Sequence, residues 1–253
     1  MTFGMWSTIA PWPPAWRSAR LSPRIPPAPT TPMNERLLAI IPAYNEAANI
    51  AAVVSRAKPY AEQVVVVDDG SSDGTGAVAL KAGAKVLRHE QNRGKGAAIE
   101  TALEYFAGTD MPMAIFLDAD GQHAPEEIPK FVAKARETGA GIVVGNRMGH
   151  TAEMPPLRRA ANRITSWLTG KLAHQPVPDS QCGFRLLRRE VLPFLSLKSS
   201  HFETETEMLI QAGRAGCKIA NVDIRTIYEP GRASRIRPWR DTVRFFRLVL
   251  KYL

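Results

Sequence analysis

Short apolar runs alternate with longer helix-prone stretches from residue 37 to residue 144, and this alternation restricts the fold more than any other feature of the sequence. The clearest run is 64–67, four valines that are followed by two aspartates. Continuous β-branched apolarity is typical of a central parallel strand, which is buried on both faces. The alternation predicts an α/β fold with a mostly parallel central sheet and helices on both faces. Strands are expected at 37–41, 64–67, 84–87, 114–117 and 142–144, and helices at 46–58, 73–82, 95–107 and 125–136.

Both ends of the chain differ in composition from this central region. Residues 1–33 contain eight of the 20 prolines and show no periodic apolar pattern. Because such a segment cannot offset its ordering entropy by packing, we predict a disordered Pro-rich extension. We expect Met33 to be the natural start, with a transit segment as the alternative. The sequence thus divides into this extension, an α/β domain over residues 34–230, and a basic loop with an amphipathic helix over residues 231–253.

The net charge of +9 resides at the two ends. Residues 1–33 contribute +3 and residues 225–253 contribute +6, whereas residues 34–224 hold 22 basic and 22 acidic side chains. Because the central region is neutral and lacks interleaved basic and aromatic residues, nucleic-acid binding is not expected. The two cysteines, Cys182 and Cys217, have no CxxC spacing, which excludes a disulfide scaffold or a zinc ribbon. No run of 18 apolar residues is present.

Polar residues gather in the loops that follow the first, second and fourth predicted strands. Ligands of open α/β sheets bind beyond the carboxyl ends of the strands, so these loops are the expected site of chemistry. Asp68 and Asp69 end a buried strand, where carboxylates without partners are costly. Helix capping by Ser72 or Asp73 explains only part of this loop. The base N–H groups and ribose hydroxyls of a nucleotide would be suitable donors for the two acids.

The loop after the fourth strand contains Asp118, Asp120 and Gln122. Two carboxylates at i and i+2 can both turn toward one hard cation, and oxygen ligands suit Mg²⁺ or Mn²⁺. An ion held by two or three protein groups keeps positions open for substrate phosphates and can neutralise a diphosphate leaving group. The alternative interpretation is a solvated acidic turn.

Other phosphate or nucleophile chemistries fit the sequence less well. Residues 92–96, NRGKG, have neither the spacing of a P-loop nor that of a dinucleotide-binding fingerprint. A haloacid-dehalogenase-like phosphotransferase would use Asp118 as its nucleophile, but this alternative leaves the two earlier loops without a role. His89 and His123 belong to no recognisable nucleophile pattern, and we expect both in surface or loop positions.

Five motifs, in this order, resemble those of family 2 glycosyltransferases: IPAYNE (41–46), VVVVDDGSSDGT (64–75), NRGKGAA (92–98), LDADGQH (117–123) and DSQCGFRLL (179–187). The sequence is most similar to the dolichol- and polyprenyl-phosphate mannose and glucose synthases, and the resemblance covers residues 37 to about 230. It implies a GT-A (nucleotide-diphospho-sugar transferase) fold, a nucleotide-diphosphate-sugar donor, Mg²⁺ or Mn²⁺, and inversion at the anomeric carbon.

The same resemblance assigns roles to individual residues. Asp118, Asp120 and Gln122 match the metal-binding DxDxQ run of the family, and the two acids are the first candidate catalytic residues. Lys95 is expected near the nucleotide. The residues expected to hold the base and ribose are Pro42, Tyr44, Glu46, Asp68 and Asp69.

The nature of the acceptor decides whether a protein base is needed. A lipid phosphate is already anionic, so its oxygen can attack without a strong base. If the acceptor is an alcohol, the candidate bases are Asp179 and the acidic run Glu203, Glu205 and Glu207. For that run the alternative is a helix start, where acids are favoured by the helix dipole. Asp179 is therefore the third candidate catalytic residue.

Arginines are the candidates for binding an acceptor phosphate. Arg147 follows the last predicted strand and matches an arginine that contacts the acceptor phosphate in the subgroup that the sequence resembles. Arg159 and Arg163 are spaced i, i+4 and share one helix face, with Arg158 beside them. Guanidinium groups bind phosphate through paired, charge-assisted hydrogen bonds. The alternative is a solvated basic helix face.

Residues 239–253 carry a cationic stripe and an apolar stripe at helical spacing. Such a helix lies in an anionic membrane interface, packs on the catalytic domain, or does both. We therefore expect peripheral membrane contact, with the protein cytoplasmic and at the inner face of the cytoplasmic membrane. The cationic stripe is Arg240, Arg244, Arg247 and Lys251, and the apolar stripe is Trp239, Val243, Phe246, Leu250 and Leu253.

The expected function is the inverting transfer of a hexose from a nucleotide-diphosphate sugar to a polyprenyl (dolichol-type) phosphate at the membrane surface. The alternatives are a saccharide or lipid-hydroxyl acceptor, the phosphotransferase considered above, and a membrane-surface binding module with an inactive nucleotide site. Within residues 225–237 the sequence departs from the subgroup it resembles, with Arg235 where Lys or His is usual and Glu229 where an arginine is usual. These departures concern the acceptor and not the fold.

Overall fold

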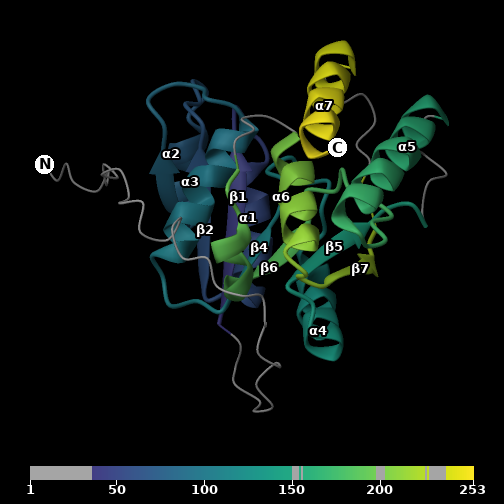
Figure 1. Cartoon of the computed structure of the whole chain (residues 1–253). Coiled ribbons are helices and arrows are strands. Elements are labelled where there is room, and N and C mark those ends of the chain that lie inside the picture. Colours follow the sequence, from purple (N-terminus) through teal and green to yellow (C-terminus); the bar gives the residue numbers. More distant parts are fainter. Residues whose placement is uncertain (1–35, 150–153, 155, 198–202, 226, 228–237) are drawn as a thin grey trace, which may run out of the picture.

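The computed structural model describes residues 36–149, 154, 156–197, 203–225, 227 and 238–253 of the chain. Within these residues, seven strands form one sheet in the order β3-β2-β1-β4-β6-β5-β7 (Figure 1). Neighbouring strands are parallel except that β6 is antiparallel to both β4 and β5. The strands are β1 (Leu37–Ala43), β2 (Gln63–Asp68), β3 (Lys85–Arg88), β4 (Met113–Phe116), β5 (Ile142–Asn146), β6 (Arg185–Arg188) and β7 (Ile219–Asp223).

Helices connect and cover these strands. The helices α5, α6 and α7 pack on one another beside the sheet (Figure 1). The α-helices are α1 (Ile50–Ala57), α2 (Thr75–Lys81), α3 (Lys95–Ala107), α4 (Ile128–Thr138), α5 (Pro156–Ala173), α6 (Glu203–Arg214) and α7 (Pro238–Tyr252), and the 3₁₀ helices are η2 (Lys58–Tyr60), η3 (Pro125–Glu127) and η4 (Arg189–Phe194).

The centre of the sheet is buried on both faces. Successive side chains of a strand point to opposite faces, and residues 37–41 of β1 and 64–67 of β2 are all buried. Burial of consecutive side chains requires a covering layer on each side, so these runs have the environment that their unbroken apolarity predicts. The mostly parallel α/β sheet expected from the sequence is therefore confirmed.

Several element boundaries differ from those expected. The helix predicted from residue 46 begins only at Ile50, because Asn45 adopts a left-handed φ of 52° and residues 47–49 form a turn. The helix predicted from residue 73 begins at Thr75, after Gly74 with a φ of 86°. The antiparallel strand β6 and the edge strand β7 were not predicted. β6 is four residues long and lies within the motif at 179–187, which has no helix–strand alternation to reveal it.

The C-terminal helix predicted at 239–253 corresponds to α7. The proline-rich extension at 1–33, the basic loop at 231–235 and Glu229 lie outside the described residues. In the part of the chain that the structure describes, no helix combines the length and the apolar character needed to cross a membrane.

Candidate functional site

The loops after β1 and β2 are joined by hydrogen bonds at the carboxyl edge of the sheet. The register pairs Ala43 with Asp68, so both strands end side by side. The backbone N–H of Asn45 donates to Ser71 Oγ at 2.9 Å, and Asn45 Oδ1 accepts from the Ser72 N–H at 3.0 Å. The backbone N–H of Glu46 donates to Thr75 Oγ1 at 2.8 Å. The two loops expected to hold a nucleotide therefore form one fixed unit.

Asp69 obtains its hydrogen-bond donors from the protein. Its Oδ1 accepts from the Arg93 N–H at 2.9 Å and from His89 Nδ1 at 2.7 Å, and its Oδ2 accepts from the Gly94 N–H at 2.8 Å. Because a carboxylate only accepts, Nδ1 of His89 carries a proton, and Nε2 forms a hydrogen bond with the Thr101 hydroxyl at 2.9 Å. Asp69 thus fixes the loop that leads into α3. The sequence did not predict that this loop would be the partner of Asp69.

Asp68 differs, because one of its oxygens has no hydrogen-bond partner. Oδ1 accepts from the Ser71 N–H at 3.0 Å, whereas the buried Oδ2 lacks a hydrogen bond and lies 3.6 Å from Arg88 Nε. A buried acceptor without a donor is uncommon in folded proteins. Oδ2 also lies against Gly76, where a Cβ atom would come within 2.6 Å of it.

The other residues expected near the base and ribose lie at the same edge. Tyr44 is exposed, and Pro42 is partly exposed at the end of β1. Glu46 is buried, and its Oε2 accepts from Asn49 Nδ2 at 2.8 Å. The structure thus places Pro42, Tyr44 and Glu46 at the same edge as Asp68 and Asp69, with the ring of Tyr44 exposed.

Asp118 follows β4 and forms an ion pair with a lysine from α3. Lys95 Nζ donates to Asp118 Oδ1 at 2.6 Å and lies 3.3 Å from Glu205 Oε1, at the start of α6. Burial alone would raise the pKa of Asp118, but the charge and hydrogen bond of Lys95, together with smaller contributions from neighbouring residues, outweigh it and hold this pKa well below its ordinary value. The same pairing raises the pKa of Lys95 although burial opposes this. Three parts of the chain thus meet at one charged centre.

Two neighbours hold Asp118 in place. The Asp118 N–H donates to His123 Nδ1 at 3.1 Å, which leaves the proton of His123 on Nε2, 3.7 Å from Asp118 Oδ2. The ring of His123 stacks on Phe184 with centroids 5.1 Å apart, and burial lowers the pKa of His123 to about 4, so it is neutral at pH 7. A Cβ atom on Gly183 would lie 2.6 Å from both carboxylate oxygens of Asp118.

Both histidines lie in loops, as expected, but neither is on the surface. His89 and His123 are buried and hydrogen-bonded to the loops that carry acidic residues. Tertiary packing determines this burial, which the sequence around the two residues did not indicate.

The oxygen donors of the acidic turn fit a divalent cation of the Mg²⁺ type. Asp118 and Asp120 are partly exposed, and Asp120 Oδ1 accepts from the Gln122 N–H at 3.0 Å, which closes the turn. Among the described residues no group of three or more His, Cys, Asp or Glu side chains is placed to hold a metal. Two carboxylates are what Mg²⁺ commonly receives from a protein when substrate phosphates complete its coordination. The donor set therefore fits such an ion, with most positions left to a ligand.

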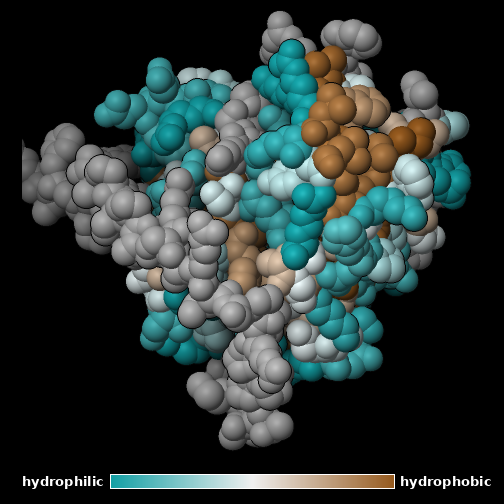
Figure 2. Space-filling model, viewed as in Figure 1, coloured by the Kyte–Doolittle hydropathy of each residue, from teal (hydrophilic) through white to brown (hydrophobic). Residues whose placement is uncertain are grey.

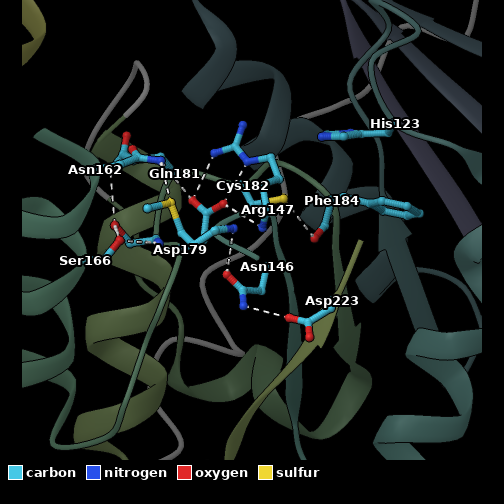
Figure 3. A network of polar contacts seen from close by, with 12 residues as sticks. His123, Asn146, Arg147, Asn162, Ser166, Asp179, Gln181, Cys182, Phe184 and Asp223 are labelled. Atoms are coloured by element: carbon cyan, nitrogen blue, oxygen red, sulfur yellow. Dashed lines mark hydrogen bonds and ion pairs between the residues drawn. The ribbon is translucent and has the colours of Figure 1, made fainter. Parts of the chain in front are cut away.

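Arg147 and Asp179 are paired with each other (Figure 3). Arg147 donates to Asp179 from Nε at 2.7 Å, from Nη2 at 2.9 Å and from its backbone N–H at 3.2 Å. Asp179 is completely buried and also lies 3.4 Å from Asn162 Nδ2 of α5. The expected phosphate ligand and the expected base are thus one buried ion pair.

The two α5 arginines occupy different environments. Arg159 Nη2 donates to the Met154 carbonyl at 3.3 Å, and its buried Nε has no hydrogen-bond partner. Arg163 is exposed. The structure therefore places Arg159, more than Arg163, toward the interior of the molecule.

Arg185 is a fully buried residue that sequence reasoning missed. Its Nη1 donates to the Glu205 carbonyl at 2.8 Å and its Nη2 to the Cys182 carbonyl at 2.5 Å. It thereby joins the loop before β6 to the first turn of α6. This fixes Glu205 beside Lys95, so the acidic run at 203–207 contributes to the site through Glu205.

Another member of that run, Glu207, anchors α7. The completely buried Glu207 Oε1 accepts from Lys251 Nζ at 2.6 Å and from the Tyr252 hydroxyl at 3.0 Å. On the packed face of α7, Phe245, Leu248 and Val249 are buried against α5 and α6.

Three members of the apolar stripe predicted at 239–253 lie on the outer side of α7 and at its end. Phe246 is 49% exposed, Leu250 71% and Leu253 87%. On α5, Ile164 and Trp167 are also exposed. Figure 2 shows apolar side chains gathered over α7 and the adjoining part of α5. The helix therefore packs on the domain and still presents an apolar surface.

Comparison with known proteins gives a consistent result. Residues 38–194 match the family described as Glycosyl transferase family 2. The UDP-N-acetylglucosamine–dolichyl-phosphate N-acetylglucosaminyltransferase of Methanococcus voltae is 35% identical over 214 residues, which cover 75% of this chain and 84% of that protein. The polyprenol monophosphomannose synthase of Mycolicibacterium smegmatis is 35% identical over 188 residues, covering 68% of this chain and 69% of that protein.

A solved structure has the same fold. The glucosyl-3-phosphoglycerate synthase of Mycobacterium tuberculosis, in complex with Mn²⁺, uridine diphosphate and phosphoglyceric acid, superposes with a TM-score of 0.63 at 25% identity. The match covers 87% of this chain and 77% of that one. The mixed sheet with its surrounding helices is thus the GT-A architecture that the sequence resemblance implied.

Proposed function

The chain belongs to glycosyl transferase family 2, and we propose that it transfers a hexose from a nucleotide-diphosphate sugar to a polyprenyl phosphate, with inversion at the anomeric carbon. Membership of the family excludes the phosphotransferase that would use Asp118 as a nucleophile. Two relatives support the acceptor class, since one is named a dolichyl-phosphate N-acetylglucosaminyltransferase and the other a polyprenol monophosphomannose synthase. This chain matches 84% and 69% of their respective lengths.

The arrangement around Asp118 is the observation on which the donor side of this proposal depends. Asp118 and Asp120 would hold Mg²⁺ or Mn²⁺, which when bound would neutralise the charge that develops on the diphosphate leaving group. Lys95 would place a further positive charge beside the same diphosphate, since it enters the site from the first turn of α3. Asp68 Oδ2, which makes no hydrogen bond and lies 3.6 Å from Arg88 Nε, retains the capacity to accept one from a base N–H group.

The reaction needs little proton transfer from the protein. An oxygen of the lipid phosphate forms a bond to the anomeric carbon as the bond from that carbon to the donor's diphosphate breaks. The nucleophile is already anionic and the nucleoside diphosphate leaves as an anion, so no base has to be supplied. The remaining task of the protein is to orient the two substrates, and Arg147 and Arg159 are the proposed ligands of the acceptor phosphate.

We also propose that α7 contacts the membrane surface through its exposed apolar side chains. Phe246, Leu250 and Leu253 would enter the interface, while the exposed Arg247 would face anionic head groups. This contact would bring the catalytic domain to the head group of a lipid-linked acceptor.

The proposal is tested by incubating the purified protein with Mg²⁺, a short polyprenyl phosphate and labelled UDP-glucose, GDP-mannose or UDP-N-acetylglucosamine. We expect label to become butanol-extractable with one of the donors and to remain aqueous with the Asp120→Ala variant. Polyprenol in place of polyprenyl phosphate is the matched acceptor control. Label on polyprenol or on an added saccharide, and none on the phosphate, would contradict the proposal.

A further inference from the structure

We propose that Asp179 is a positioning residue that orients Arg147 toward the acceptor phosphate, and that it is not a proton acceptor in the reaction. The inference rests on the transfer to a lipid phosphate proposed above. It gives a role to a buried acid that would otherwise be a candidate base.

The pairing between the two side chains fixes the plane of the guanidinium group. Arg147 uses Nε and Nη2 in two parallel hydrogen bonds to Asp179, at 2.7 and 2.9 Å, and its backbone N–H adds a third at 3.2 Å. Such two-point contacts define direction as well as attraction. Asn162 approaches the same carboxylate from α5 at 3.4 Å, so Asp179 is held from two elements.

The fork leaves one edge of Arg147 available. In Figure 3, Nη1 points away from Asp179. Within the described residues, the hydrogen bonds of the Arg147 side chain all go to Asp179 through the other two nitrogens. Nη1 therefore retains its donors for a ligand, on a side chain that remains 11% exposed.

The two hydrogen bonds to Asp179 also fix the Arg147 side chain before any ligand binds. A long side chain loses rotamer freedom when it binds a ligand, which weakens binding. Because Arg147 has already lost this freedom, we expect it to bind a phosphate at a lower entropic cost.

The same geometry excludes Asp179 as a base. A general base must lie within hydrogen-bond reach of the proton that it accepts. Asp179 is completely buried, and both of its oxygens accept from Arg147. No surface of the carboxylate is left for a substrate hydroxyl.

Isothermal titration with farnesyl phosphate, followed by steady-state kinetics with a short polyprenyl phosphate, tests the inference. We expect Asp179→Asn to raise the Kd of farnesyl phosphate about tenfold and to raise the acceptor KM similarly, because the amide cannot accept from both nitrogens. The Kd of UDP, kcat and the shape of the pH profile are expected to change less than threefold. The control is Asp223→Asn, the same change at an exposed acid that accepts from Asn146 at 2.7 Å, and it should leave all values unchanged.

Asn162→Ala provides a second variant that keeps the ion pair, and it should raise the Kd of farnesyl phosphate by a smaller factor. Unchanged binding of farnesyl phosphate by Asp179→Asn would overturn the inference. A hundredfold lower kcat at constant acceptor KM, with loss of the acidic limb of the pH profile, would also overturn it, because this result would indicate a base. So would equal losses of UDP and phosphate binding, which would indicate a general structural role. Absence of transfer to polyprenyl phosphate by the unmodified protein would instead refute the proposed function, while the titrations would still decide the role of Asp179.

Discussion

The ammonium nitrogen of Lys95 lies 2.6 Å from Oδ1 of Asp118, so the carboxylate that is expected to bind a metal ion already forms an ion pair with a lysine. A divalent ion and Lys95 must therefore compete for this oxygen. Glu205, 3.3 Å from the same nitrogen, offers the lysine a second carboxylate when the first is taken.

This competition predicts that Lys95→Met binds Mn²⁺ alone more tightly than the unmodified protein does. Removing a positive charge at contact distance from Asp118 should lower the Kd for Mn²⁺ on the order of tenfold. Electron paramagnetic resonance of free Mn²⁺ measures this without any turnover. Lys134→Met, a surface change on α4, is the control and should have no effect. Weaker Mn²⁺ binding by Lys95→Met would show that the lysine does not oppose the ion.

Gly183→Ala should disable the acidic turn without unfolding the protein. The added methyl group would lie 2.6 Å from both oxygens of Asp118, so the carboxylate has to leave its position. We expect Mn²⁺ affinity to fall on the order of tenfold and transfer activity to fall further. Gly149→Ala is the matched change, because a Cβ there meets no atom of the described residues within 4 Å. Equal behaviour of the two variants would contradict the assigned role of Gly183.

Arg189→Met should destabilise the fold. The guanidinium donates to the carbonyls of Phe106 at 2.9 Å, Ala107 at 3.2 Å and Met111 at 2.8 Å, and so satisfies the end of α3. Losing these charge-assisted hydrogen bonds should lower the free energy of unfolding in urea by about 3 kcal/mol. Arg56→Met removes an exposed pair with Glu126 and should cost less than about 1 kcal/mol.

The two thiols should be unreactive in the native protein. Burial raises the pKa of Cys182 to about 12 and that of Cys217 to about 11. Since the thiolate is the reactive form, Ellman's reagent at pH 8 should label neither cysteine in buffer and both in urea. Rapid labelling of the native protein would show that the region around β6 opens readily.

These raised pKa values also give a pH dependence of stability. A folded-state pKa above the unfolded value stabilises the fold below the unfolded pKa, and this contribution is lost as pH rises toward the folded value. We therefore expect the free energy of unfolding to fall between about pH 9 and pH 11, by up to about 1.4 kcal/mol per pH unit for each thiol. Replacing both cysteines by alanine should flatten this part of the profile.

The membrane contact of α7 is tested by Phe246→Ser combined with Leu250→Ser. Both side chains are exposed, so the change should leave the melting temperature unaltered while reducing sedimentation with vesicles that contain anionic lipid about tenfold or more. Leu80→Ser, an equally exposed apolar position on α2, is the control. Unchanged sedimentation of the double variant would refute the contact.

Local patterns in the sequence were sufficient to predict strands β1, β2 and β4 and the acidic loops that follow β2 and β4. The buried valines of β2 and the acidic residues at the ends of β2 and β4 follow from strand apolarity and from the rule that ligands bind beyond parallel strands. The pairing of Arg147 with Asp179 could not be predicted in this way, because 32 positions separate the two residues and only the insertion of β6 brings them together.

The same reason explains why the contacts of the two histidines, Arg185 and Glu205 were not predicted. His123 and Arg185 lie within quoted motifs and Glu205 was a candidate base, but the partners of these residues are set by tertiary packing, which a local pattern does not reveal. Asp69 shows the opposite case, in which the residue was identified but its protein donors, the backbone of Arg93 and Gly94, were not.

The reversed direction of β6 brings a second, independent segment to the proposed site. Because β6 runs against β4 and β5, the residues that precede it, and not those that follow it, lie at the carboxyl edge of the parallel strands. The segment from α5 to residue 184, which includes Asp179, therefore reaches this edge without involving β1 or β2, and a change in its length would leave the register of those two strands as it is.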